Sequence, residues 1–157
     1  MTTPSVGLSG TGSTGVNSSV AALDMDGDGV GDDYLASDYQ DNRSATYRSP
    51  FSLAAGVTVK IQKVRLYGSA EWFGRVPAYT VVDSADFQAQ STGEPISPDV
   101  TQELGSVLNA GVGLEWFYTA RFKGYASFTT DYSAKRSGTV TNVALTDWDI
   151  HHFVTGA

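Results

Sequence analysis

Long runs in which apolar and polar residues alternate are the feature that most constrains the fold. In residues 50–61, PFSLAAGVTVKI, every second residue is apolar and the residues between them are small or polar. The same alternation recurs in residues 64–73, 106–117 and 122–132, and again in 148–157. A period of two predicts a strand with two different faces. The sequence therefore predicts an all-β fold, an antiparallel meander of about five long strands.

The lengths of these strands and of their connections favour a transmembrane β-barrel. A tilted strand needs about 9–11 residues to cross a bilayer, whereas strands of soluble proteins usually have about 5–6. The connections alternate between short, at 62–63 and 118–121, and long, at 74–105 and 133–147. Outer-membrane barrels have short turns at one end and long loops at the other. Proline and glycine mark 74–105 as a loop rather than continuous sheet, with AYTVVD as a short extension of a strand.

The composition of the two faces agrees with this prediction. Aromatic residues near the strand ends are assigned to the apolar face, where amphipathic rings favour the headgroup layer. These are Phe51, Trp72, Trp116, Phe122, Tyr132 and Trp148. The other face mixes small, polar and charged residues, which suits a water-filled lumen. A soluble antiparallel sheet with one wet face gives the same alternation and remains the alternative.

Six charged residues are predicted to line the lumen. They are Lys60, Arg65, Glu71, Glu115, Lys123 and Asp131. Four of them, all except Glu71 and Asp131, cluster near the short turns, and Arg65 and Glu115 can lie within cross-strand reach. One interpretation is a charged constriction that biases permeation. The other is a set of salt bridges that only neutralises interior charge.

A second candidate site is the aspartate-rich stretch LDMDGDGVGDDY, residues 23–34. Asp24, Asp26, Asp28 and Asp32 have the alternating spacing with which carboxylates converge on calcium. The stretch is not an EF-hand, because the twelfth position is Leu35 instead of a bidentate glutamate. We expect calcium to be structural and to order an outside loop, since metal binding offsets the entropy cost of ordering glycine-rich chain. An acidic solvated loop without metal is the alternative.

The acidic stretch belongs to a predicted first region, residues 1–47, an outside loop rich in glycine, serine and aspartate. Barrel hairpins are predicted in 48–157, with long outside loops at 74–105 and 133–147. Residues 1–47 contain seven aspartates and a single basic residue, Arg43. The stretch GTGSTG, residues 10–15, lacks the lysine of a phosphate-binding loop and is predicted to be flexible loop. Residues 1–20 have neither a basic start nor an apolar run, so we expect that the chain is not exported or that its true N-terminus is missing.

Composition and motifs exclude several classes of function. The chain has 157 residues, a net charge of −7 and no cysteine, so nucleic acid is not an expected partner and thiol chemistry is excluded. No apolar run approaches the roughly 18 residues of a spanning helix. His151 and His152 are adjacent in a strand and point to opposite faces, so they cannot hold one ion together. Nothing in the spacing of Glu71 and Asp131 favours a hydrolytic carboxylate pair. We therefore expect no enzymatic activity.

Several stretches carry a resemblance to a known family. SPFSLAAGVTVKIQKVRLYGSAEWF, YTVVD, LNAGVGLEWFYTARFKGYASFTTDYS and DWDIHHFVTGA, within residues 47–157, resemble hairpins of bacterial outer-membrane barrels. They are most similar to the long-chain fatty-acid transporter family and its relatives. The resemblance implies an outer-membrane location, contact with its lipid, and passive uptake of small hydrophobic molecules.

The chain also departs from that family. Residues 1–46 do not resemble the family's lumenal hatch, and five strands are too few to close a barrel. We therefore expect an internal fragment, and the sequence predicts neither the oligomeric state nor the transported compound. The alternative function is a secreted or cell-surface binding module, a β-sandwich stabilised by calcium, whose loops bind a glycan or a protein.

Overall fold

The computed structural model describes all residues except 1, 25, 26, 28, 136–140, 142 and 144–146. The described residues form strands and no helix, so the all-β prediction is confirmed. No helix long and apolar enough to cross a membrane occurs among them. The strands are β1 (Thr2–Thr3), β2 (Gly7–Leu23), β3 (Asp32–Arg48), β4 (Ser52–Ile61), β5 (Val64–Phe73), β6 (Val76–Asp83), β7 (Phe87–Gln88), β8 (Pro95–Ile96), β9 (Val100–Leu104), β10 (Val107–Phe117), β11 (Lys123–Asp131) and β12 (Ile150–Gly156).

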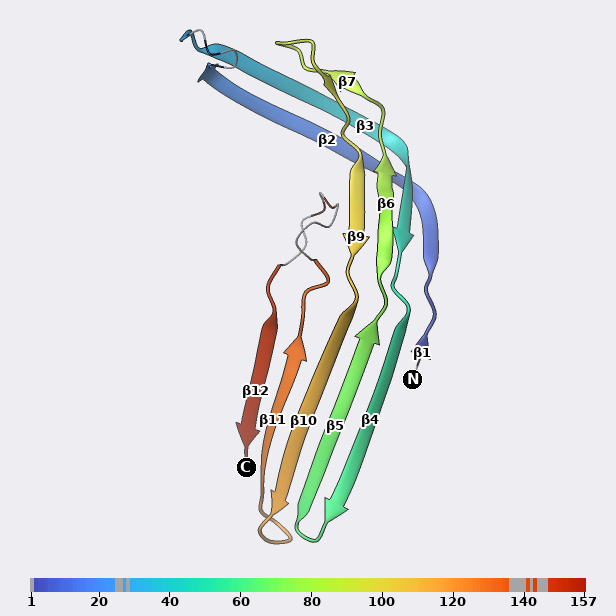
Figure 1. The fold of residues 1–157 in the computed structure, drawn as a ribbon, viewed down its shortest axis with the longest axis vertical. Helices are drawn as coiled ribbons and strands as arrows, with labels where there is room; N and C mark the ends of the chain where they lie inside the picture. The colour runs from blue at the N-terminus through green and yellow to red at the C-terminus, as the bar shows by residue number, and fades with distance from the viewer. Residues whose placement is uncertain (1, 25–26, 28, 136–140, 142, 144–146) are drawn as a thin grey trace.

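The five strands predicted from the alternation are β4, β5, β10, β11 and β12. Together with β1 they form one antiparallel sheet in the order β1-β4-β5-β10-β11-β12. The short turns between β4 and β5 and between β10 and β11 lie at the same end of this sheet (Figure 1). Gln62 opens the first turn with a φ of 52°, the positive value that a tight hairpin turn requires. The antiparallel meander is therefore confirmed, and β1 and β12 are its edges.

A second antiparallel sheet, β2-β3-β6-β9, continues the first one away from the short turns. Four chain segments pass from one sheet to the other, residues 4–6, 49–51, 74–75 and 105–106 (Figure 1). We call the last three segments the bends. The amide of Gly74 donates to the carbonyl of Phe51 over 2.8 Å, so two bends are hydrogen-bonded to each other. A Cβ on Gly74 would lie only 3.5 Å from that same oxygen. The bends interrupt the hydrogen-bond ladders of neighbouring strands at the same height of the sheet, so that these strands change direction at the same place.

The stretch GTGSTG, predicted as flexible loop, is strand, and this prediction is wrong. Segment 74–105 is interrupted sheet, as predicted, and AYTVVD lies inside β6. GTGSTG lies within β2, which pairs with β3 from Gly7↔Arg48 to Leu23↔Asp32. A Cβ on Gly12 would lie 3.5 Å from Ala45 and 3.6 Å from Val82. Cross-strand pairing thus overrides the low strand propensity of glycine and serine. Segment 74–105 contains β6, β7, β8 and β9, with Pro77 at a register shift, where proline is tolerated.

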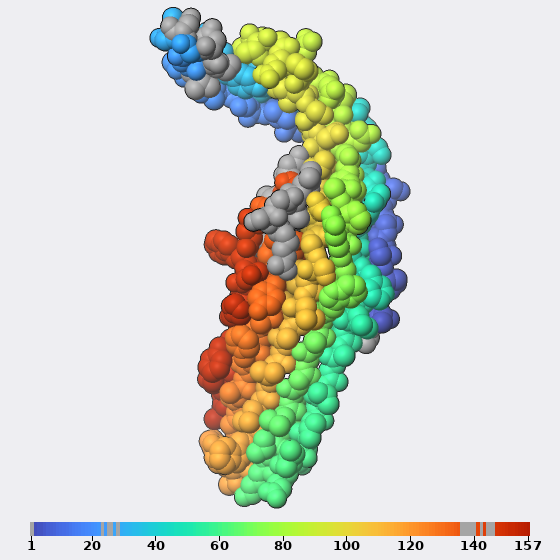
Figure 2. Space-filling view, viewed as in Figure 1, coloured from blue at the N-terminus to red at the C-terminus, as the bar shows by residue number. Residues whose placement is uncertain are grey.

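The molecule has a curved outline (Figure 2), and few of its described side chains are buried. Its few buried side chains gather mainly at the bends, where Val76 and Val107 are 5% and 3% exposed. The Tyr79 hydroxyl donates to Gln102 Oε1 over 2.6 Å and accepts from the amide of Arg48 over 3.1 Å. A single layer of this kind leaves both faces of the six-stranded sheet accessible.

Candidate functional site

One face of the six-stranded sheet is apolar and exposed. The strand register lines up its residues in cross-strand rows, which include Leu53–Trp72–Leu108, Ala55–Ala70–Ala110, Val57–Gly68–Val112, Val59–Leu66–Leu114 and Ile61–Val64–Trp116. Val57 and Val112, in the central row, are each 62% exposed. Phe128 of β11 continues this row, and Phe153 of β12 lies opposite Phe128 and is 74% exposed. We call this surface the apolar face.

The register of β12 corrects one prediction. With Trp148 on the apolar side, a period of two also predicts Ile150 and Val154 on the apolar side of the last strand. The structure pairs them with Asp131 and Ser127, on the polar side, and places Phe153 on the apolar face. The run DWDIHHFV does not alternate cleanly, so pairing with β11 decides its orientation. His151 and His152 lie opposite Thr130 and Thr129 and point to opposite faces, as predicted.

Aromatic rings lie at both ends of the apolar face. At the short turns, Trp116 stacks on Tyr118 with ring centroids 5.0 Å apart, and Tyr118 lies 5.5 Å from Phe122. At the bends, Phe51 meets Trp72 edge to face at 6.1 Å. The Trp72 indole N–H donates to Ser106 Oγ over 2.7 Å. Of the other predicted aromatics, Tyr132 contacts the His151 ring at 5.7 Å, and Trp148 precedes β12 and is 78% exposed.

The opposite, polar face carries four of the predicted lumen-lining residues close together. Glu115 Oε1 accepts from Lys123 Nζ over 2.7 Å, and Glu115 Oε2 accepts from Arg65 Nη1 over 3.1 Å. Lys60 lies opposite Arg65 in the register, and Arg65 lies opposite Glu115. The predicted proximity of Arg65 and Glu115 is therefore confirmed. We call Lys60, Arg65, Glu115 and Lys123 the charged cluster.

Two neighbours of the charged cluster escaped the sequence analysis. The Tyr67 hydroxyl donates to Glu115 Oε2 over 2.5 Å, so this carboxylate is held by three side chains. The Phe117 ring lies beneath two cations, 5.2 Å from Arg65 Cζ and 5.8 Å from Lys60 Nζ. The alternation already places Tyr67 and Phe117 on the polar face together with the charged residues. Only the register shows that these two residues contact the charged cluster, Tyr67 through Glu115 and Phe117 through Arg65 and Lys60.

The other two predicted lumen residues lie apart from the charged cluster. Glu71 is opposite Ala54 and Asn109, near the bends, and Asp131 is opposite Ile150. The strand β10 separates the strands of Glu71 and Asp131. Neighbouring strands are about 4.8 Å apart, so the backbones of these two residues are two spacings, about 10 Å, from each other. The two residues share the polar face without direct contact across adjacent strands.

Between the charged cluster and these carboxylates, the polar face is hollowed. Small and hydroxyl-bearing residues fill two cross-strand rows, Gly56–Ser69–Gly111–Thr129 and Thr58–Tyr67–Gly113–Ser127. Together with Val57, Gly68 and Val112 of the row between them, they line a hollow of about 400 Å³, which we call the polar trough. A Cβ on Gly111 would lie 2.8 Å from Ser69 Oγ and 2.9 Å from Thr129 Cγ2. Glycine is therefore required there for the two hydroxyl-bearing neighbours to lie side by side.

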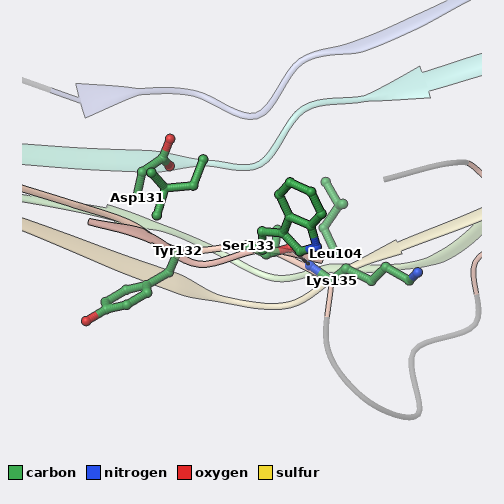
Figure 3. A pocket seen from close by; sticks show the side chains of 8 residues that line it. Leu104, Asp131, Tyr132, Ser133 and Lys135 are labelled. Carbon is green, nitrogen blue, oxygen red and sulfur yellow. Dashed lines mark hydrogen bonds between the residues drawn. The ribbon is translucent and has the colours of Figure 1, made fainter. Parts of the chain in front are cut away.

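A second pocket, of about 250 Å³, lies beside the ends of β9 and β11. Its lining includes Leu104, Tyr132 and Ser133, and Figure 3 shows Asp131 and Lys135 at opposite ends of it. Lys135 Nζ is paired with Asp147 Oδ2 over 3.0 Å. The charged groups of this pocket point apart, so they do not converge on a common ligand position.

The predicted metal ligands lie at the tip of the β2–β3 hairpin. Asp24 accepts backbone amides on both oxygens, from Gly27 over 2.6 Å and from Gly29 over 3.0 Å. Asp32 begins β3 opposite Leu23. Asp26 and Asp28 lie outside the described residues. Among the described residues no group of three candidate ligands is present. A carboxylate has about four lone-pair sites, so Asp24 retains acceptor capacity, and the calcium site stays a prediction.

No protein-family model matches the chain, and no match to it was found among curated proteins or solved structures. The resemblance to fatty-acid transporters therefore stays a prediction.

Proposed function

We propose that the chain forms part of an outer-membrane β-barrel through which small molecules pass passively, without catalysis. The observation that carries this proposal is the apolar face, whose large side chains are exposed along all five long strands. Water is a poor solvent for such a surface, and soluble monomers rarely expose contiguous apolar patches of more than a few hundred Å². Lipid is the partner that the proposal assigns to this face.

The dimensions of the apolar face support the proposal. Phe51 and Ile61 lie at its two ends on one chain segment, ten residue steps apart. At about 3.3 Å per step this distance is about 33 Å along the strand. Strands of membrane barrels tilt by about 35–45°, which reduces the height to about 25 Å, the height of the apolar band of such barrels. The aromatic rings at both ends lie where interfacial girdles are expected.

The polar face supports the same proposal from the other side of the sheet. Its trough and charged cluster suit contact with water, and charge of this kind is tolerated where it is paired. A barrel must close, because unpaired strand edges are unstable in hydrocarbon. The proposed assembly therefore includes strands that pair with the edges at β1 and β12. The hydrophobic nature of the solutes rests on the resemblance alone.

The rival function, a secreted β-sandwich module, requires a second sheet over the apolar face. Residues such as Val57 and Val112 would then be buried in a dry core. In the described part of the chain no second sheet covers them, and their exposure favours lipid instead. The aspartate-rich hairpin tip, with calcium as a structural ion, would in either case lie away from the short turns.

The experiment that tests the proposal is quenching of tryptophan fluorescence by brominated lipids. The double variant Trp72→Phe, Trp148→Phe leaves Trp116, and the variant Trp72→Phe, Trp116→Phe leaves Trp148 outside the strands. The chain is folded into vesicles of brominated or ordinary phosphatidylcholine. We expect strong quenching of Trp116 and weak quenching of Trp148. Equal, weak quenching of both would contradict lipid contact and reject the proposal.

A further inference from the structure

The charges of the polar face are divided by sign along the strands. At the short-turn end, the charged cluster contains three cations, Lys60, Arg65 and Lys123, and one carboxylate, Glu115. At the other end of the polar trough, the described charges on this face of β5 and β11 are the carboxylates Glu71 and Asp131. One carboxylate cannot neutralise three cations, so the charged cluster has two positive charges in excess, and Lys63 and Arg121 in the short turns add to them.

The geometry shows which cation is available to a solute. Both oxygens of Glu115 are occupied, by Lys123 on one side and by Arg65 with Tyr67 on the other. Lys60 is exposed and its ammonium lies over the Phe117 ring, 5.8 Å from the centroid. The ring holds this ammonium beside Arg65 although the two charges repel each other. The cluster is therefore more than a set of neutralising salt bridges.

The surroundings of the charged cluster favour a small anion that keeps its water or accepts hydrogen bonds from hydroxyl groups. The charged cluster adjoins the polar trough, where Thr58, Ser127 and Thr129 offer hydroxyl groups and glycines leave room. Ammonium and guanidinium groups are strong donors to carboxylate and phosphate oxygens. Cationic side chains that line a pore favour the passage of anions over cations.

We propose that the charged cluster makes the short-turn end of the passage selective for small anions, with Lys60 as the residue that determines the selectivity. This inference rests on the proposed function, because it requires that solutes travel along the polar face. It assigns the sign of the solute charge, which the alternation of the sequence leaves open.

The test is the reversal potential of the closed assembly that contains the chain, measured in planar bilayers under a tenfold gradient of KCl. The wild type should show a higher permeability for chloride than for potassium. Lys60→Gln should lower the chloride-to-potassium ratio about threefold, and Lys60→Glu should lower it further. Lys60 has no ion-pair partner among the described contacts, so these variants leave the pairs of Glu115 intact. Lys123→Gln provides a second variant with the same expected direction.

The matched control is Arg43→Gln, in β3 of the second sheet, where the side chain donates to the carbonyl of Asp83. Glutamine can still donate there, and the permeability ratio should stay that of the wild type. Conductance with equal ratios in wild type and Lys60 variants overturns the anion selectivity and leaves the proposed function standing. Absence of any conductance contradicts the proposed function, and the anion selectivity with it. Heat-dependent gel mobility of each variant shows whether it has folded.

Discussion

The most direct consequence of lipid contact concerns a charge placed at the centre of the apolar face. Val112 lies four residues from Leu108 and four from Trp116, which mark the ends of this face on β10. Four steps are about 13 Å along the strand and about 10 Å in height at a tilt near 40°. Val112 should therefore lie near the bilayer midplane.

Val112→Arg should accordingly cost about 2–4 kcal/mol of folding free energy in a membrane, whereas Leu108→Arg should cost about 0–1 kcal/mol near the interface. The control is Thr129→Arg, because Thr129 lies on the polar face of β11 next to the central row and is exposed. We expect its cost to stay within about 0.5 kcal/mol, as for ordinary surface substitutions.

The measurement is urea unfolding of each variant, folded into phosphatidylcholine vesicles and followed by tryptophan fluorescence. Depth dependence is the decisive result, since a solvent-exposed face has no reason to distinguish Val112 from Leu108. If Val112→Arg unfolded with the same free energy as Thr129→Arg, the assignment of lipid to the apolar face would be refuted.

Two further predictions follow from local geometry, and a third follows from the spacing of the aspartates in the sequence. Gln62→Gly should stabilise the fold by about 1 kcal/mol, because glycine adopts the φ of 52° without strain. The neighbouring Lys63→Gly should not stabilise it. Equal midpoints of urea unfolding for the two variants would refute this prediction. Gly111→Val should lower the free energy of unfolding by about 1–3 kcal/mol, because a Cβ there would lie within 3.0 Å of two side chains. Gly56→Ala, whose Cβ would have its nearest contact at 3.5 Å, should lower it less in the same urea assay. Calorimetric titration with calcium should release heat that is lost in Asp26→Ala; equal heats in both proteins would dispose of the calcium site.

The sequence alone predicted the five strands β4, β5, β10, β11 and β12 and the two faces of the first four. Residues 64–73 and 106–117 alternate without interruption, and β5 and β10 occupy nearly the same ranges. The two-residue turn at 62–63 followed from the same pattern. A period of two is a local property, because successive side chains of any strand point to opposite sides. The alternation can therefore be recognised without knowing the partner strand.

The second sheet could not be predicted in the same way. The residues of β2 are mainly glycine, serine and threonine, and they do not alternate in hydropathy. They form a strand because β3 offers a continuous ladder of partners along almost the whole of β2. The stability of that hairpin comes from pairing rather than from an apolar pattern, so composition indicated a loop.

The register decided the candidate site. The sequence showed that Arg65 and Glu115 share a face, but the contacts with Tyr67 and Lys123 require that β5, β10 and β11 pair without a slip of one residue. The same dependence explains the last strand, where pairing with β11 placed Phe153 rather than Val154 on the apolar face. A slip of one residue moves every side chain to the other face. The sequence by itself thus determined the alternating strands of the first sheet. The tertiary structure determined the strands of the second sheet and which side chains meet, because both depend on pairing between residues distant in the chain.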